Sequence, residues 1–337
     1  GYAISNVKAN GADVPFTVSD YQEYNEALLE VTIPAEEEVE LTMEYSGFPQ
    51  ESLPTMQGGK ELSDEYLCLE NSALSPRVMN VMPGDAGYPA EIEITLPENM
   101  LAIPFGSSEA EVVAEHEDGT RTWRYEHNGA GGILYAGDYI REDIEAGGMT
   151  IEFYYGRKHQ AVMEAAEAVD AVKEVVDYCT EHYGSLSFGT GETLKLIQSR
   201  VAGGGYATTG ASLLDEADFT AANLGNAEKG GGAGEVMIHE LVHQWWGLGN
   251  MFDDPDGSPW SSEGLTVYTT YRIVKELYGE DYARENYVDQ WQQAVDDYFL
   301  NFYVRHSEYL EMLPEGERLN IAGGLSGVRH YSEMPLK

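Results

Sequence analysis

The hydrophobic pattern of this chain changes its period near Gly156. Before that residue, apolar and polar side chains alternate, as in residues 29–33, 90–96 and 149–153. A period of two is typical of antiparallel strands that bury one face, and Asn-Gly, Asp-Gly and Gly-Gly pairs supply turns between them. We therefore predict that residues 1–155 form an antiparallel β-sandwich domain.

Beyond Gly156 the spacing of the apolar residues becomes helical. They recur at three and four residues from Val162 to Tyr183, and Gly184 is a natural end for such a helix. Further strands are predicted at 194–198 and 211–214, and helices at 234–247, 263–279 and 281–303. Because 337 residues exceed most single cores, we predict a second, mainly helical domain at 156–337 and expect both domains to be incomplete.

The composition excludes several classes of partner. With 19 basic and 59 acidic residues, the net charge of -40 repels the phosphates of nucleic acids and anionic lipids. No apolar run reaches the roughly 18 residues that span a bilayer, so we expect no membrane insertion by these residues. Cys68 and Cys179 are predicted to be unpaired thiols. The compartment stays open. One expectation is an extracytoplasmic domain of a larger membrane-associated protein, whose anchoring segments would lie outside this chain.

The residues His239-Glu-Leu-Val-His243 carry the clearest chemical signal. On a helix, residues four apart lie on one face with about 6 Å of axial rise, so both imidazoles can bind a single ion. Glu240 would then face the water position and act as general base in hydrolysis. A solvated histidine pair is the alternative, but the apolar Val236, Met237 and Leu241 indicate a buried helix. We predict one Zn²⁺ per chain.

A tetrahedral zinc site needs a further protein ligand. Glu263, within Trp260-Ser-Ser-Glu-Gly264, follows at the start of the next predicted helix. Asp253, Asp254 and Asp256 are competitors in the intervening loop. We favour Glu263 because a helix holds a ligand more rigidly than a turn does.

The two motifs, His239-Glu-Leu-Val-His-Gln-Trp-Trp-Gly247 and Trp260-Ser-Ser-Glu-Gly264, resemble the elements HExxHQW(F/W)G and WxxEG of the aminopeptidase N-like metallopeptidases. This gluzincin family includes leukotriene A hydrolase. The resemblance implies a saddle-shaped β domain at 1–155 and a thermolysin-like catalytic domain at 156–337. The gap between the second histidine and the glutamate is one residue longer than is usual in the family, which a loop absorbs easily.

Family aminopeptidases also carry a GAMEN-like strand whose glutamate binds the substrate's amine. The corresponding segment here, Gly205-Tyr206-Ala207-Thr-Thr-Gly210, has no acid. By resemblance, residues 205 to 207 would pair with an extended peptide by β-augmentation. Glu70 and Glu216 are candidates for the amine contact, although each is better explained as a surface acid.

The family's downstream tyrosine stabilises the oxyanion, and Tyr331 stands near the expected distance. It could instead be an ordinary buried residue, with the catalytic tyrosine beyond Lys337. The leading hypothesis is a zinc metallopeptidase of aminopeptidase type that acts on peptides. The alternatives are a catalytically impaired, peptide-binding ectodomain and a zinc endopeptidase.

Overall fold

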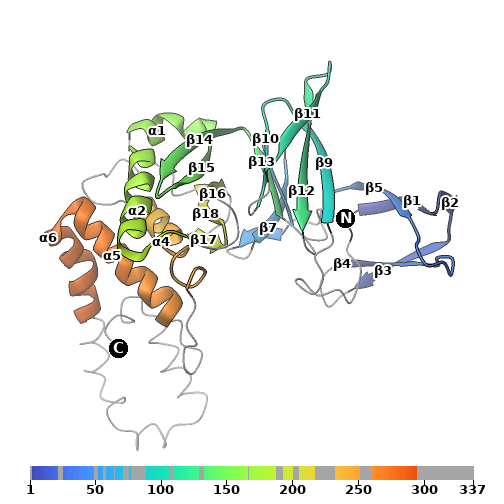
Figure 1. The fold of residues 1–337 in the computed structure, drawn as a ribbon. Helices are drawn as coiled ribbons and strands as arrows, with labels where there is room; N and C mark the ends of the chain where they lie inside the picture. The colour runs from blue at the N-terminus through green and yellow to red at the C-terminus, as the bar shows by residue number, and fades with distance from the viewer. Residues whose placement is uncertain are drawn as a thin grey trace, which may run out of the picture. The chain divides into compact units, whose positions relative to one another are not determined.

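A computed structural model of the chain describes residues 2–21, 26–48, 52–55, 58–63, 65–70, 76, 89–105, 109–128, 133–165, 167–186, 193–199, 205–216, 232–250 and 260–293 (Figure 1). The chain divides into two compact units. The first comprises Gly1–Pro54, Gly58–Pro104 and Ser108–Gly137, and the second comprises Thr55–Gln57, Phe105–Ser107 and Asp138–Lys337. A sheet-rich first part is thus followed by helices, which confirms the predicted order of secondary structure.

In the described part of the first unit, the regular secondary structure consists of β-strands. They are β1 (Tyr2–Ala9), β2 (Ala12–Asp13), β3 (Phe16–Tyr21), β4 (Glu26–Val31), β5 (Leu41–Gly47), β6 (Ser52–Thr55), β7 (Gly58–Leu62), β8 (Tyr66–Glu70), β9 (Pro89–Pro97), β10 (Leu101–Pro104), β11 (Glu111–Glu115), β12 (Thr120–Asn128) and β13 (Ile133–Gly137). Their sheets have the orders β2-β1-β5, β3-β4, β10-β13-β8-β7-β6 and β11-β12-β9. Apolar side chains from several of these strands pack into one buried cluster, which includes Leu67, Leu96, Tyr125 and Leu134.

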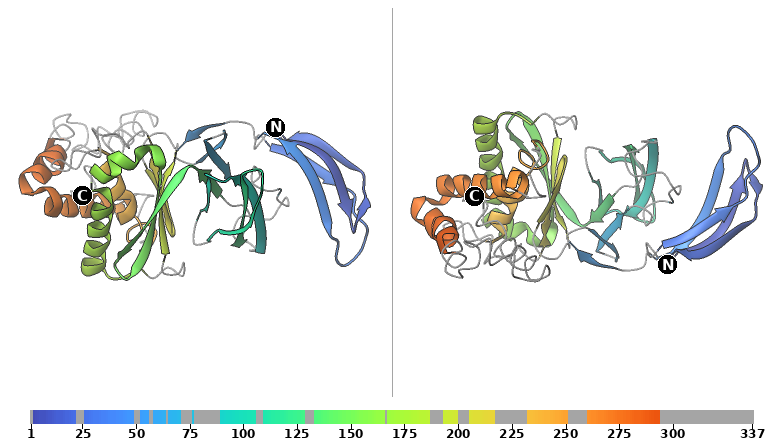
Figure 2. Two further views of the ribbon diagram at one scale, coloured as in Figure 1. Left: turned by 90° about the horizontal axis from the view of Figure 1, so that it is seen from above. Right: turned by 90° about the horizontal axis from the view of Figure 1, so that it is seen from below.

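The second unit contains a five-stranded sheet with helices on one face (Figure 2). Its strands are β14 (Tyr139–Ala146), β15 (Met149–Gly156), β16 (Thr193–Ser199), β17 (Gly205–Thr208) and β18 (Ala211–Asp215). The order is β14-β15-β16-β18-β17, with β15, β16 and β18 parallel and both outer pairs antiparallel. The edge strand β17 therefore pairs with β18 on one side.

The β14–β15 hairpin lies in the second unit, whereas the predicted division after residue 155 would put it in the first. The hydrophobic period changes after β15, but the sheet does not end there, because β15 pairs in parallel with β16. A boundary drawn from periodicity follows the local pattern, while a compact unit is defined by pairing between distant segments.

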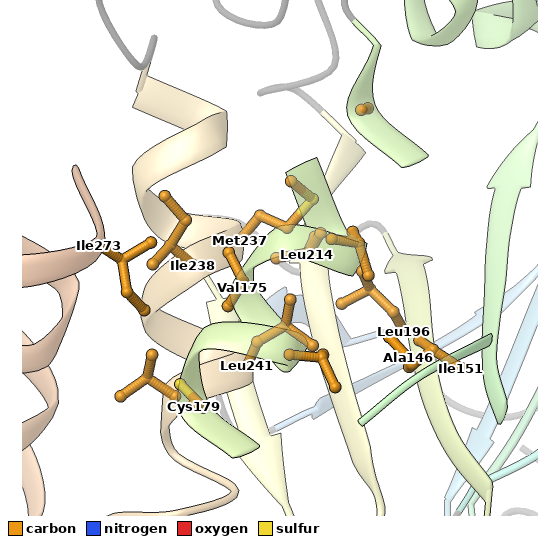
Figure 3. Close-up of a cluster of buried hydrophobic side chains, with 14 of the residues drawn as sticks. Ala146, Ile151, Val175, Cys179, Leu196, Leu214, Met237, Ile238, Leu241 and Ile273 are labelled. Carbon is orange, nitrogen blue, oxygen red and sulfur yellow. The ribbon is translucent and has the colours of Figure 1, made fainter. Parts of the chain in front are cut away.

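Helices cover the sheet through a continuous apolar core (Figure 3). They are α1 (Gln160–Ala165), α2 (Ala168–Tyr183), α4 (Gly232–Val242), α5 (Leu265–Tyr278) and α6 (Glu280–Ala283), with a 3₁₀ turn η2 (Arg157–His159) and π-helical turns η6 (Trp260–Gly264) and η7 (Arg284–Val288). Val175 and Cys179 of α2, Leu241 of α4 and Ile273 of α5 are buried together with Leu196 of β16. This packing holds α4 between α2, α5 and the sheet.

Three helical boundaries differ from the predictions. The predicted helix from 162 to 183 is divided into α1 and α2 near Glu167, whose backbone is left-handed at φ 51°, and it ends before Gly184 as expected. The helix predicted at 234–247 ends as α4 at Val242. In the region predicted as one helix from 281, α6 passes directly into η7.

Two further expectations concern the described residues. Cys68 and Cys179 are buried, and neither forms a disulfide bond within the described residues, which agrees with the prediction. Among the described residues, no helix combines the length and the apolar character needed to cross a membrane.

Candidate metal centre

The His239–His243 segment lies at the C-terminal end of α4, which ends at Val242. Ile238, Leu241 and Val242 are fully buried and anchor this end of the helix against the apolar core. His243 is the residue after the helix, and its amide still donates to the carbonyl of His239 at 3.1 Å. The last turn therefore keeps the two imidazoles one above the other.

The three predicted ligands meet at one place. The Nε2 atoms of His239 and His243 are 3.0 Å apart, and each is 3.3 Å from Oε2 of Glu263. A tetrahedron with bonds of about 2.0–2.1 Å, as for zinc, has edges of roughly 3.3–3.4 Å. The three donor atoms thus have almost the spacing of one face of a zinc tetrahedron. In the described part of the chain, this is the group of histidine, cysteine and acidic side chains that could hold a metal ion.

The surroundings of these atoms also fit a metal. Nδ1 of His243 lies 3.1 Å from the carbonyl oxygen of Trp246, to which it can donate, and this bond leaves Nε2 with its lone pair toward the site. Thr266 Oγ1 is 3.3 Å from the same Nδ1. Oε2 of Glu263 is buried and makes no other hydrogen bond within the described residues. Two imidazoles and one carboxylate match the donor set of hydrolytic zinc sites, so the residues present fit the ion.

Electrostatics within the cluster couple its groups closely. Burial by itself raises the pKa of Glu263, but bonds to His239 and His243 outweigh burial and hold that pKa well below its usual range. Burial lowers the pKa of His243, yet Glu263 reverses this and leaves it raised. For Glu240, burial raises the pKa to about 7, while His243 opposes the rise and Glu263 adds to it. The lowered pKa keeps the Glu263 carboxylate ionised, the form in which a carboxylate binds a metal ion.

The β17–β18 hairpin supports α4 through residues that sequence reasoning missed. Ser212, fully buried in β18, donates to the carbonyl oxygen of Glu240 at 2.9 Å. Gln244 is also fully buried; its Oε1 accepts from the amide of Gly210 at 3.1 Å, and its Nε2 donates to the carbonyl of Thr208 at 2.9 Å. Gln244 directly follows a predicted ligand and lies in an apolar segment. A buried polar side chain there needs hydrogen-bond partners, and this signal could have identified it.

The predicted substrate-binding segment forms β17. Gly205 is buried and lies against the side chain of Glu240, Tyr206 is 39% exposed, and Ala207 is half-buried. Glu216 pairs with Lys158 at 2.9 Å.

The remaining predicted site residues stay predictions. Glu70 ends β8 in the first unit. Tyr331 lies outside the described residues, as do the competing ligands Asp253, Asp254 and Asp256.

Comparisons with known proteins agree with the fold. The crystal structure of Legionella pneumophila aminopeptidase A in complex with aspartic acid has a TM-score of 0.54 and 17% identity, over 82% of this chain and 33% of that chain. That of an M1 zinc metallopeptidase from Deinococcus radiodurans has a TM-score of 0.46 and 17% identity, over 87% of this chain and 64% of that one. At such identities the likeness concerns the fold alone.

Sequence comparison adds a local match. Leucine aminopeptidase 2 of Emericella nidulans is 31% identical over 81 residues, which are 24% of this chain and 12% of that protein. No family model matches the sequence. The predicted resemblance to the aminopeptidase family is confirmed by the fold shared with Legionella pneumophila aminopeptidase A and by the local match to leucine aminopeptidase 2. This chain spans less than two thirds of the length of each protein compared.

Proposed function

We propose that this chain is the zinc-binding part of a peptidase that removes residues from peptide N-termini. One observation carries the proposal: Nε2 of His239, Nε2 of His243 and Oε2 of Glu263 converge at 3.0 to 3.3 Å, with Glu240 on the same turn. A structural role for this group is a poor account, because the core nearby is apolar and a buried carboxylate oxygen has no partner besides the two imidazoles among the described residues.

Each residue has a definite task in this mechanism. His239, His243 and Glu263 would hold Zn²⁺, which when bound supplies a Lewis acid and lowers the pKa of water. Glu240 is 7% exposed, and its carboxylate accepts the proton of the attacking water. The edge of β17 that no described strand pairs with lies beside Glu240, and it can pair with an extended peptide backbone and so place the scissile carbonyl next to the base.

We also propose that the second unit is a thermolysin-like catalytic domain. The support is the succession of an edge hairpin (β17–β18), a helix that carries two histidines (α4) and a helix preceded by the third ligand (η6 and α5). In this arrangement the two ligand-bearing helices pack against each other, and the sheet edge lies beside the base.

The test is Glu240→Gln in the full-length protein. Zinc content should stay near one per chain, since Glu240 is not a ligand. Hydrolysis of aminoacyl reporter peptides should fall by about 10²–10⁴, the usual worth of a general base. Glu181→Gln, an exposed acid on α2, is the matched control and should change neither quantity. A zinc-loaded parent protein without peptidase activity would overturn the proposal.

The position of cleavage needs a second measurement, because β17 carries no acid to bind a free amine. Peptides with free and N-acetylated termini should be compared at equal concentration. Acetylation removes the cationic amine, so an aminopeptidase should lose most of its activity on the acetylated peptide. Similar rates on both would instead assign an endopeptidase.

A further inference from the structure

The first residue of β17 is in closer contact with the general base than any side chain would permit. A Cβ atom built on Gly205 would lie 2.2 Å from Cγ, 2.6 Å from Cδ and 2.8 Å from Oε1 of Glu240. Ordinary contacts between carbon atoms are about 3.5–4.0 Å. The space that a side chain at position 205 would fill is therefore occupied by the carboxyl group of Glu240.

Neither partner in this contact can withdraw easily. Gly205 pairs with Leu214 in the β17–β18 ladder, so its backbone position is set by the sheet. The backbone of Glu240 is held from the same hairpin, because Ser212 donates to its carbonyl at 2.9 Å. The backbone of Glu240 and the strand beside it are thus both attached to the β17–β18 hairpin.

The backbone of Gly205 does not itself require glycine. Its φ lies outside the left-handed region, unlike those of Gly184, Gly210 and Gly247, so alanine could adopt the same conformation without strain. The absence of a side chain at this position is explained by the contact with Glu240 and not by the local backbone.

We infer that Gly205 is a positioning residue for Glu240: its bare backbone forms the wall against which the carboxyl group of the base rests. This inference rests on the proposed function for its catalytic consequence, while the contact itself is independent of it. A methyl group at position 205 would displace the carboxyl group by about 1 Å, and misplacements of that size can lower a rate by about 10²-fold.

The experiment is Gly205→Ala in the zinc-loaded full-length protein. We expect kcat to fall by about 10- to 100-fold, with KM within about threefold and zinc content unchanged, because the base moves while the ligands stay. Gly156→Ala is the matched control. It lies in β15 of the same sheet, also has an unstrained φ, and would place its Cβ 3.1 Å from the end of the Gln198 side chain. The control should keep kcat.

A second readout tests the contact without activity. In the Glu240→Ala background the atoms that crowd position 205 are gone, so Gly205→Ala should lower the urea midpoint only when Glu240 is present. Equal shifts in both backgrounds, or an unchanged kcat in the single variant, would overturn the inference. If the single variant fails to fold, recovery with Glu240→Ala supports the contact, and failure in both backgrounds overturns it. An inactive parent protein would refute the proposed function, and this unfolding cycle would still decide the contact.

Discussion

Replacement of Gln244 by methionine tests how the hairpin supports the ligand-bearing helix. The glutamine side chain is fully buried and joins two backbone groups of the β17–β18 turn, the amide of Gly210 and the carbonyl of Thr208. Methionine has nearly the same length and volume but neither accepts nor donates strongly here. The substitution therefore removes the hydrogen bonds and leaves little cavity.

The cost follows mainly from the amide of Gly210 and the carbonyl of Thr208, although longer contacts of Gln244 Nε2 with Ser212 Oγ at 3.3 Å and the carbonyl of Ala211 at 3.5 Å are also lost. A buried, unsatisfied backbone group costs about 1–3 kcal/mol. Gly210 is buried, so its amide should cost an amount in the middle of that range, whereas Thr208 is half-buried and its carbonyl should cost less. Ser212 keeps its own bond to Glu240. We expect Gln244→Met to lower the free energy of unfolding by about 2–4 kcal/mol.

Urea unfolding followed by tryptophan fluorescence measures this loss, because every tryptophan except Trp123 lies in the second unit. Free zinc must be held at one concentration, since binding to the native state adds to stability. Gln160→Met is the control; Gln160 is exposed on α1 and should change stability by less than about 0.5 kcal/mol. A loss for Gln244→Met as small as that of the control would refute the reasoning.

Two other predictions concern glycine and cysteine. Gly247 has φ 86°, and a Cβ there would lie 2.3 Å from Oγ of Ser262, next to the carboxylate ligand, whereas Gly279 has φ 92° and open space. Both alanine variants bear backbone strain of about 1–2 kcal/mol. Only Gly247→Ala should weaken zinc binding, by about 10- to 100-fold as measured by chelator competition. Equal zinc affinities of the two variants would contradict this prediction. Cys68 and Cys179 are buried, and burial raises the pKa of the Cys179 thiol, so a thiol reagent should label either one only after unfolding. Rapid labelling in native buffer would show that burial is incomplete.

Much of the secondary structure could be predicted because it depends on local patterns. The alternation in residues 90–96 corresponds to β9, and the helical spacing before Gly184 corresponds to α2. The membership of the β14–β15 hairpin could not be predicted in the same way. It depends on the parallel pairing of β15 with β16. Both strands are apolar, and strands of this character could pair equally well with many other strands.

The end of α4 illustrates a second limit. Apolar spacing continues to Trp245 and Trp246, so the sequence predicts a helix as far as Gly247. In the structure the backbone tightens after Val242, where the amide of Trp245 bonds to the carbonyl of Val242. The indole of Trp245 then donates to the carbonyl of Gly184. A turn buries these two rings as well as a helix would. The hydrogen bond from Trp245 to the distant Gly184 favours the turn.

Some features of the site can likewise be predicted from local sequence, and others depend on distant segments of the chain. The chemical identity of the ligands is local, because His239 and His243 are brought together by one helical turn that the spacing predicts. Glu263 comes from a separate turn, and a Cβ atom at Gly247 would clash there with Ser262, the residue next to this third ligand. A glycine in a sequence indicates only freedom of the backbone. Which group uses the space left by its missing side chain depends on a segment elsewhere in the chain, so the positioning of a catalytic group becomes visible only in three dimensions.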